Sequence, residues 1–541
     1  MPARLSTSSS ESAEAKTRVT RAARRLVVTL AAGLPVYLFL HALSFRRVPS
    51  GLEGGPAVEA LRGVRLVLKG KFEVLTFSIA TSAETLWLYV VGASVTLLGP
   101  DWLPVVLPSI VASAAVVALT VVLAARLAPD TPPAVPFLFS AGSVWLFHYG
   151  QVGLRAISAP LFFLVVCLLV ERAERPGAPA RFQAATGFVL GLSIYAYSSC
   201  RVLPVAWLLW KGLQWLREKD ARTRLKPALL AGLAGLSVAS IPNLLFFLRE
   251  PGEFLFRGYY VYRGSWWWKP VNVFWTALLP FHHPRFYTVW LGDGHNFDAT
   301  AVSLTSAGVH PIDPVTALAF AAGLFVAVRL PRPPAVSWIL AVFAAGTVLL
   351  GISGPSLTRL LVLQPVYALL ATLGAGALRR RAPRVALWAA PLLLVPFLLG
   401  AKEYAAFGRN EEAQLEYLPA ANAAGARARD LTDADPGRRV LLVLRKGRDV
   451  VKLYTYRNIE RIWLMELVSQ NVDITGQVLA RFRPGVILVE RRPNLAPFAA
   501  SLGRERARAF PLFDEYEMSS APGVGPTDRG NMHRLWNEIE R

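Results

Sequence analysis

Apolar runs of membrane-span length recur along this chain of 541 residues and decide its class. Crossing the hydrocarbon core of a bilayer takes about 20 mostly apolar residues. The first such run covers residues 26–43, and ten more lie at 103–126, 133–149, 154–171, 182–198, 200–216, 226–248, 313–329, 334–352, 356–378 and 385–401. A soluble protein of this length would not carry so many. We therefore predict an all-α polytopic membrane domain with about eleven spans.

The apolar stretch at 84–98 is too short for a comfortable span and is decisive for the topology. Residues 1–25 are basic and predicted to be a disordered tail, which places the N-terminus in the cytoplasm. If 84–98 spans the membrane, the basic loops at 217–226, 329–332 and 379–384 all lie outside, against the positive-inside rule. If it lies in the interface, all three lie inside. We therefore predict a juxtamembrane helix at 84–98.

The net charge of +22 raises the question of a nucleic-acid partner. The basic residues cluster in short loops between spans, as the positive-inside rule requires, and no nucleic-acid-binding motif accompanies them. Cys167 and Cys200 both lie inside apolar runs, which indicates small buried residues and not a disulfide framework or a metal site. The first apolar run lacks a small-x-small cleavage site, so we interpret it as an anchor.

This topology predicts three extramembrane regions beside the membrane domain of residues 26–401. Two are outer loops, at 44–102 and 249–312. The third is residues 402–541, where charged residues return and a helix-like stretch, Asn410–Asp430, precedes strand-like Val440–Leu444 and Val486–Glu490. We predict a small C-terminal α/β domain outside the cytoplasm. The absence of an evident internal repeat weakens a transporter interpretation.

Several motifs, taken in order, resemble one family. They are GLEGGPAVEALRGVRLVLKG, AETLWLYVVGASVTLLGPDW, HYGQVGLRAISAPL, GLSIYAYSSCRVLPV, LGDGHN and GPSLTRLLVLQPV. Their order and spacing over residues 26 to 400 are similar to the GT-C superfamily of membrane glycosyltransferases. The nearest branch contains the protein O-mannosyltransferases and the lipid A aminoarabinose transferase. The resemblance implies a GT-C-like fold and a polyprenyl-phosphate sugar donor.

Acidic residues of the two outer loops are the catalytic candidates. The family's first motif is an Asp-Glu pair whose Asp is taken as the general base, and here only Glu53 remains. Glu53 is our candidate base, against the alternative of a solvated loop carboxylate. Asp293 and His295 lie in a segment matching a family motif, although both are also common turn residues. Glu59 is a candidate for substrate binding, but helical spacing favours a surface pair with Arg62.

Three arginines are candidates for binding the departing phosphate. Arg155, Arg201 and Arg359 each lie at the predicted outer end of a span, against the positive-inside bias. A charge near a membrane span is costly, which favours function, although snorkelling to the interface explains any single arginine. Tyr197 is a candidate for stacking on a sugar or prenyl group, or else part of an interfacial aromatic belt.

These observations predict an inverting glycosyltransferase. It moves a sugar from polyprenyl phosphate to a lipid, glycan or protein hydroxyl at the outer face of a bacterial plasma (inner) membrane. The N-terminus is cytoplasmic and the C-terminus extracytoplasmic. We expect no cofactor, no protein-held metal and no nucleic-acid partner. Two alternatives remain: a transporter or flippase of a lipid-linked substrate, and a catalytically inactive relative, which the missing Asp supports.

Overall fold

The structure is a computed structural model that describes part of the chain. The described residues are 7–45, 47–52, 54–70, 73, 75–76, 83–217, 222–252, 269–281, 309–329, 333–353, 356–410, 414, 417–444, 448–455, 462–466, 484, 486–491 and 508–517. Contacts divide the chain into two units. The first contains residues 1–49, 62–93 and 106–416, and the second contains 50–61, 94–105 and 417–541.

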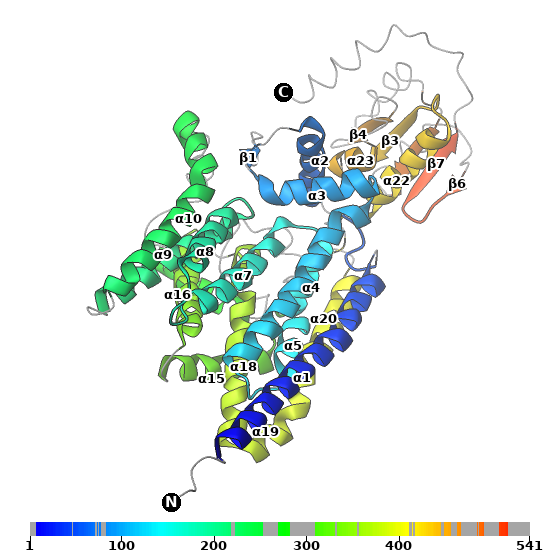
Figure 1. Cartoon of the computed structure of the whole chain (residues 1–541). Coiled ribbons are helices and arrows are strands. Elements are labelled where there is room, and N and C mark those ends of the chain that lie inside the picture. Colours follow the sequence, from blue (N-terminus) through cyan, green and yellow to red (C-terminus); the bar gives the residue numbers. More distant parts are fainter. Residues whose placement is uncertain are drawn as a thin grey trace, which may run out of the picture. The chain divides into compact units, whose positions relative to one another are not determined.

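The first unit is helical (Figure 1). Its helices are α1 (Thr7–Ser44), α5 (Ala134–Ala141), α6 (Val144–Val152), α7 (Ser158–Ala173), α8 (Ala180–Ser193), α9 (Val202–Arg217), α10 (Arg222–Arg249), α12 (Lys269–Leu278), α15 (Pro314–Arg329), α16 (Pro334–Ile352), α17 (Leu357–Leu360), α18 (Gln364–Arg381), α19 (Pro383–Ala389) and α20 (Val395–Arg409). Its 3-10 turns are η1 (Arg155–Ile157), η2 (Ser198–Arg201), η5 (Leu279–Phe281), η6 (Leu361–Leu363) and η7 (Ala390–Leu394). Helices shared by the two units are α2 (Gly54–Lys69), α3 (Thr85–Leu98) and α4 (Trp102–Leu127).

Seven helices in the described residues are long and apolar enough to cross a membrane. They are Ala22–Ser44, Trp102–Leu127, Arg155–Ala173, Leu225–Arg249, Pro334–Ile352, Leu357–Arg381 and Pro383–Arg409. The chain is therefore an integral membrane protein, and the predicted helical membrane domain is confirmed. The other predicted spans correspond to helices that are shorter, such as α15, or divided, such as α5 and α6. The number eleven stays a prediction.

Helix boundaries in this unit follow from local capping. The run predicted at 133–149 is divided because α5 ends before Gly142, and the Ser143 side chain accepts a hydrogen bond from the Leu146 N–H at the start of α6. Helix α6 then ends at Gly153, whose φ of 82° suits a residue without a side chain. At the N-terminus, α1 begins at Thr7, within the segment predicted to be a disordered tail. The alanines of this segment favour helix, which accounts for the difference.

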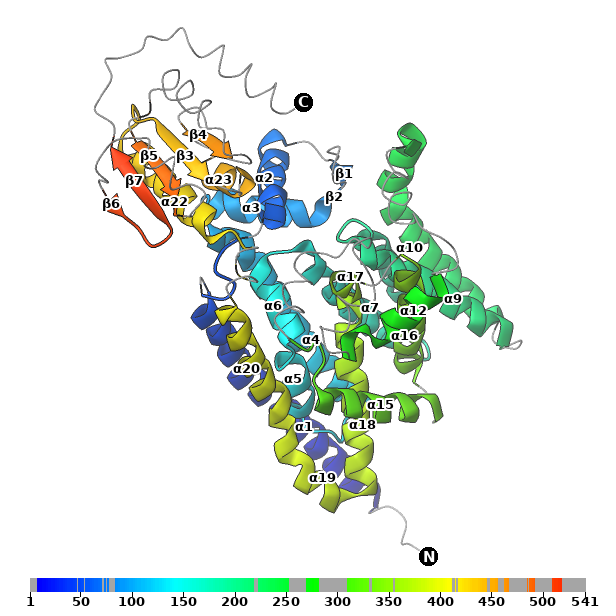
Figure 2. The ribbon, with the colours of Figure 1, turned by 180° about the vertical axis from the view of Figure 1, so that it is seen from behind.

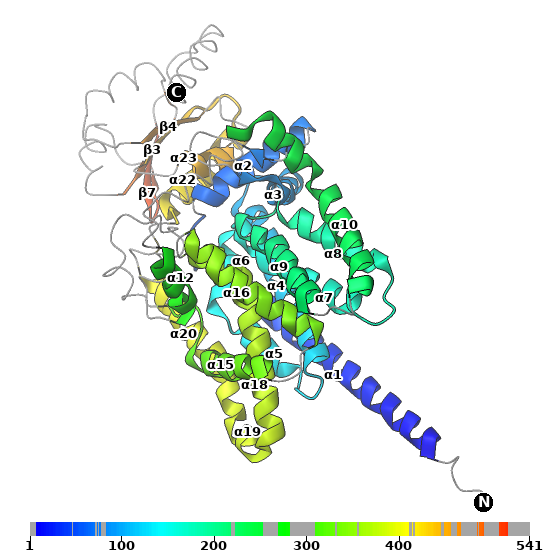
Figure 3. The ribbon, with the colours of Figure 1, turned by 90° about the vertical axis from the view of Figure 1, so that its left-hand side faces the viewer.

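Two groups of helices pack within the first unit. In one, α8 lies against α7 and α10, and α16 lies against α7, α9 and α12 (Figure 3). In the other, α18 lies against α5 and α15, and α20 lies against α5 and α6 (Figure 2). Helix α18 and the turn η6 also contact α7 and so join the groups.

Glycines allow the closest of these helix crossings. A Cβ atom at Gly187 of α8 would lie 1.8 Å from the carbonyl oxygen of Gly232 in α10. A Cβ atom at Gly323 of α15 would lie 1.7 Å from the carbonyl oxygen of Leu370 in α18. Because apolar side chains gain nothing by leaving lipid, such close backbone packing stabilises membrane helix pairs.

The second unit contains the C-terminal sheet. Its elements are α22 (Pro419–Ala434), α23 (Arg448–Thr455), β3 (Val440–Leu444), β4 (Ile462–Glu466), β5 (Val486–Glu490), β6 (Arg508–Ala509) and β7 (Phe513–Glu517). The strand order is β4-β3-β5-β7-β6, with β3 parallel to β4 and β5, and β7 antiparallel to β5 and β6. Helix α22 packs on β3 and β5, and α23 packs on β4. This confirms the predicted small α/β fold, and the two predicted strands have the observed bounds.

Candidate functional site

A short hairpin fixes the position of Glu84. Strand β2 (Ala83–Glu84) pairs antiparallel with β1 (Leu75–Thr76), and α3 begins at the next residue. The Thr85 hydroxyl donates to the carbonyl oxygen of Glu73 at 2.6 Å, and the Glu73 N–H donates to the hydroxyl of Tyr89 at 2.9 Å. These bonds fasten the first turn of α3 to the chain before the hairpin. Glu84 itself is only 1% exposed.

Tyr195 attaches this turn to helix α10. Its carbonyl oxygen accepts from the Leu86 N–H at 3.0 Å. Its hydroxyl donates to the carbonyl oxygen of Ala239 at 2.7 Å and accepts from the Asn243 N–H at 3.2 Å. Those two backbone groups are four residues apart, so the hydroxyl bonds a donor and an acceptor one turn apart on α10, beside Pro242. Hydrogen bonds of Tyr195 therefore connect the segment around Glu84 to α10, which is one of the candidate membrane spans.

Two arginines pair with the Glu84 carboxylate. Arg155, on η1, has its Nε 3.5 Å from Oε2 of Glu84, and Arg201, on η2, has its Nη2 3.3 Å from Oε1. The guanidinium of Arg155 lies 5.7 Å from the centre of the Tyr197 ring, which is itself buried. The predicted candidates Arg155, Arg201 and Tyr197 are therefore brought together by the fold.

The charge and exposure of this cluster suit an anion. Two guanidinium groups and one carboxylate leave a net charge of +1 on Glu84, Arg155 and Arg201. The Arg155 side chain is 10% exposed, whereas that of Arg201 is 44% exposed. A buried carboxylate needs cationic partners, and it holds both guanidinium groups in position. The accessible Arg201 can then bind a phosphate through two parallel N–H donors.

Arg359 lies on a neighbouring segment. It is on α17, which packs against the η2 turn that carries Arg201. Its Nη1 donates to the carbonyl oxygen of Ser353 at 2.8 Å and lies 3.3 Å from the Ser353 hydroxyl. Arg359 therefore lies on a segment that packs beside the turn carrying Arg201, and its guanidinium is held by Ser353.

The remaining predicted residues lie elsewhere. Glu53, Asp293 and His295 are outside the described residues. Glu59, on α2, is only 8% exposed, so the expected surface position is wrong: its side chain lies on a packed face of the helix. Over the described ranges, no group of three or more His, Cys, Asp or Glu side chains is arranged to hold a metal ion.

Glu84 is the residue that the site prediction missed. It lies in the predicted outer loop and within AETLWL, a stretch that resembles the family's x-E-P-L motif. That match was available from the sequence. What the sequence did not contain was the burial of the carboxylate, or its pairing with residues 71 and 117 positions further along the chain.

Comparisons with known proteins concern the fold. No protein-family model and no curated protein matches the chain. Among solved structures it is similar to ArnT from Cupriavidus metallidurans bound to undecaprenyl phosphate, with a TM-score of 0.58 and 14% identity over 92% of this chain and 99% of that one. The apo state of that protein gives a TM-score of 0.51 and 14% identity over 91% and 98%. These structures show that the chain has the fold of ArnT, as the sequence predicted.

Proposed function

We propose that this chain is a membrane glycosyltransferase that uses a polyprenyl-phosphate sugar donor. The observation that carries the proposal is the pairing of buried Glu84 with Arg155 and accessible Arg201 in a fold shared with ArnT. The ArnT structure contains undecaprenyl phosphate, a lipid whose phosphate has the charge that this cluster suits. The acceptor is a hydroxyl of a lipid, glycan or protein.

In the proposed reaction, the acceptor oxygen attacks the anomeric carbon from the face opposite the phosphate. The bond between that carbon and the phosphate oxygen breaks, so the sugar inverts its configuration. Negative charge grows on the leaving phosphate, where Arg201 and Arg155 stabilise it. Glu84 keeps the two guanidinium groups in place. Glu53 accepts the proton of the attacking hydroxyl, and Arg359, Asp293, His295, Glu59 and Tyr197 contribute to donor or acceptor binding.

We also propose the orientation given by the loop charges. The N-terminus is cytoplasmic, residues 402–541 form a domain outside the cytoplasm, and the site faces outward in a bacterial plasma membrane. The basic C-terminal ends of α9 and α18 then face the cytoplasm. Labelling of single cysteines introduced at these ends and in residues 44–102 tests this orientation.

Label transfer from purified lipids tests the function. Purified protein is incubated with a panel of polyprenyl-phosphate sugars carrying a radiolabelled sugar, and release of label from the lipid is measured. Glu84→Gln lowers the rate on the order of 100-fold, because the arginines lose the charge that positions them. Glu73→Gln is the matched control, since the described hydrogen bonds of Glu73 involve only its backbone.

Three outcomes contradict parts of the proposal. If label stays on every lipid of the panel, the enzyme assignment is wrong. If the intact lipid instead crosses the membrane of reconstituted vesicles, the chain is a flippase. If Glu53→Gln keeps full activity, Glu53 is not the base.

A further inference from the structure

The second unit contains a polar hollow with no role in the reaction described above. It measures about 270 Å³ and is lined by Leu98, Gly99, Pro100, Asp101, Arg429, Asp433 and Tyr454. All seven residues belong to this one unit. The volume is near the lower end for small-molecule sites, which begin at about 300 Å³. It therefore has room for one small ring.

One wall of the hollow is the connection between α3 and α4. Gly99 ends α3 with its N–H bonded to the carbonyl oxygen of Val95 at 2.9 Å, and its φ of 98° reverses the chain in a way that favours glycine. Asp101 comes just before α4, and its Oδ1 accepts from the N–H of Trp102, the first residue of that helix, at 2.6 Å. The other carboxylate oxygen, Oδ2, is directed toward Arg429.

The opposite wall is one face of α22. Arg429 and Asp433 are four residues apart and so share this face, with Gly425 one turn earlier. Gly425 packs against Tyr454 of α23, where an added Cβ would lie 3.1 Å from Cδ2 of the ring. The Arg429 guanidinium lies 5.8 Å from the centre of the same ring. Tyr454, only 4% exposed, forms the floor of the hollow.

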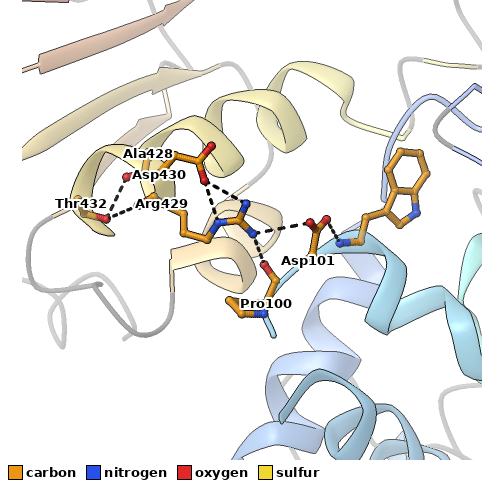
Figure 4. Close-up of polar contacts among 7 residues, drawn as sticks. Pro100, Asp101, Ala428, Arg429, Asp430 and Thr432 are labelled. Atoms are coloured by element: carbon orange, nitrogen blue, oxygen red, sulfur yellow. Dashed lines mark hydrogen bonds and ion pairs between the residues drawn. The ribbon is translucent and has the colours of Figure 1, made fainter. Parts of the chain in front are cut away.

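Arg429 crosses between the two walls (Figure 4). Its Nη1 donates to the carbonyl oxygen of Pro100 at 2.8 Å and lies 3.8 Å from Oδ2 of Asp101. Its Nε and Nη2 donate to Oδ1 of Asp430 at 3.2 and 3.1 Å. Among the described residues, these hydrogen bonds use three of the five N–H groups of the guanidinium, which leaves two for the Asp101 carboxylate and a ligand.

The lining selects the chemistry of the ligand. Asp101 and Asp433 line the hollow together with Arg429, and Arg429 is also paired with Asp430, so an anionic ligand is repelled. The described residues hold no cluster of metal ligands here. Carboxylate acceptors, an arginine donor and an aromatic floor match the hydroxyls and the apolar C–H face of a sugar ring. We propose that this hollow binds one ring of a neutral sugar, as a carbohydrate subsite of the second unit.

Sugar binding to the full-length protein in detergent tests the proposal. Mannose, galactose and arabinose are titrated at millimolar concentrations, without any donor lipid, and binding is followed by saturation-transfer NMR. We expect saturable binding of at least one sugar. Asp433→Asn weakens it about fivefold, because a hydrogen bond to a charged acceptor is stronger than one to an amide. Asp433→Lys removes it.

Asp435→Asn and Asp435→Lys are the matched controls. Asp435 is exposed, lies two residues from Asp433 and does not line the hollow. Its variants keep the wild-type affinity, and thermal melting verifies that all four proteins are folded. No saturable binding of any of the three sugars overturns the proposal, as does equal binding by Asp433→Lys and Asp435→Lys. Because the assay contains no donor, its failure is distinct from a failure of the transferase proposal.

Discussion

Two ion-pair clusters, one around Glu84 and one around Glu174, lie toward opposite ends of helices α7 and α9. They differ in how exposed their cations are. Before these helices, η1 and η2 carry Arg155 and Arg201, which flank Glu84 at 3.5 and 3.3 Å. Toward their other ends, Lys211 of α9 contacts Glu174, the residue after α7, at 2.5 Å.

The second cluster is closed. The side chains of Lys211 and Glu174 are 3% and 12% exposed. Gln183 donates to Glu174 at 2.7 Å, and the Lys211 ammonium also lies 4.7 Å from the centre of the Trp210 ring. Glu84 makes longer contacts, and one of its partners, Arg201, is 44% exposed. A buried ion pair whose charged groups are already bonded within the protein can only hold helices together. An ion pair with an accessible guanidinium can also bind a ligand.

The largest expected effect is at the closed cluster. Lys211→Met leaves Glu174 without its cationic partner in a buried position, which lowers the free energy of unfolding by about 3–5 kcal/mol. Thermal melting in detergent measures this loss. Lys402→Met, at an exposed position on α20, is the control and leaves the melting temperature unchanged. Equal melting of both variants would show that the Lys211–Glu174 pair does not hold the helices.

The two arginines of the open cluster should separate into different roles. Arg201→Gln weakens binding of polyprenyl phosphate about tenfold, as expected for one charge-assisted hydrogen bond, and barely changes the melting temperature. Arg155→Gln lowers stability by about 2 kcal/mol, because it removes a partner of buried Glu84. Lipid-binding titrations and melting curves on both variants check this. Identical behaviour of the two would remove the distinction based on exposure.

Substitution of Tyr195 tests whether its hydroxyl is needed to hold the segment around Glu84 against α10. Tyr195→Phe removes the hydroxyl bonded to Ala239 and Asn243, which costs about 1–2 kcal/mol of stability. The bond from the Leu86 N–H uses the Tyr195 backbone and is retained, so transfer activity per folded molecule falls much less than in Glu84→Gln. An activity loss as large as that of Glu84→Gln would mean that the hydroxyl itself acts in the reaction.

Raising the salt concentration has the smallest expected effect, and it tests both clusters in one experiment. The Debye length shortens from about 10 Å at 0.1 M to about 3 Å at 1 M salt. Binding of the lipid phosphate at exposed Arg201 therefore weakens several-fold over this range. The melting-temperature difference between wild type and Lys211→Met changes little, since a buried pair is screened much less. Salt-independent lipid binding would argue against a charge contact at Arg201.

The elements of the fold were largely predictable. The span predicted at 334–352 is α16 with the same bounds, and β3 and β5 begin and end where VLLVL and VILVE do. These elements are set by apolar composition over contiguous residues, which a membrane or a sheet core selects directly. The division of 133–149 at Gly142 was missed, because one glycine and one capping serine outweigh the apolar run around them.

The sequence predicted several residues of the candidate site, but it did not predict which of them contact one another. The arginines stood out because they lie at span ends against the positive-inside bias, and that is a property of single positions in the sequence. Four separate segments meet through the hydrogen bonds of the Tyr195 hydroxyl to α10 and the contacts of buried Glu84 with Arg155 and Arg201. Local hydrophobicity and charge determine which segments enter the membrane and where cations lie. Which carboxylate meets which cation depends on how the helices pack, and close packing is a property of the whole fold.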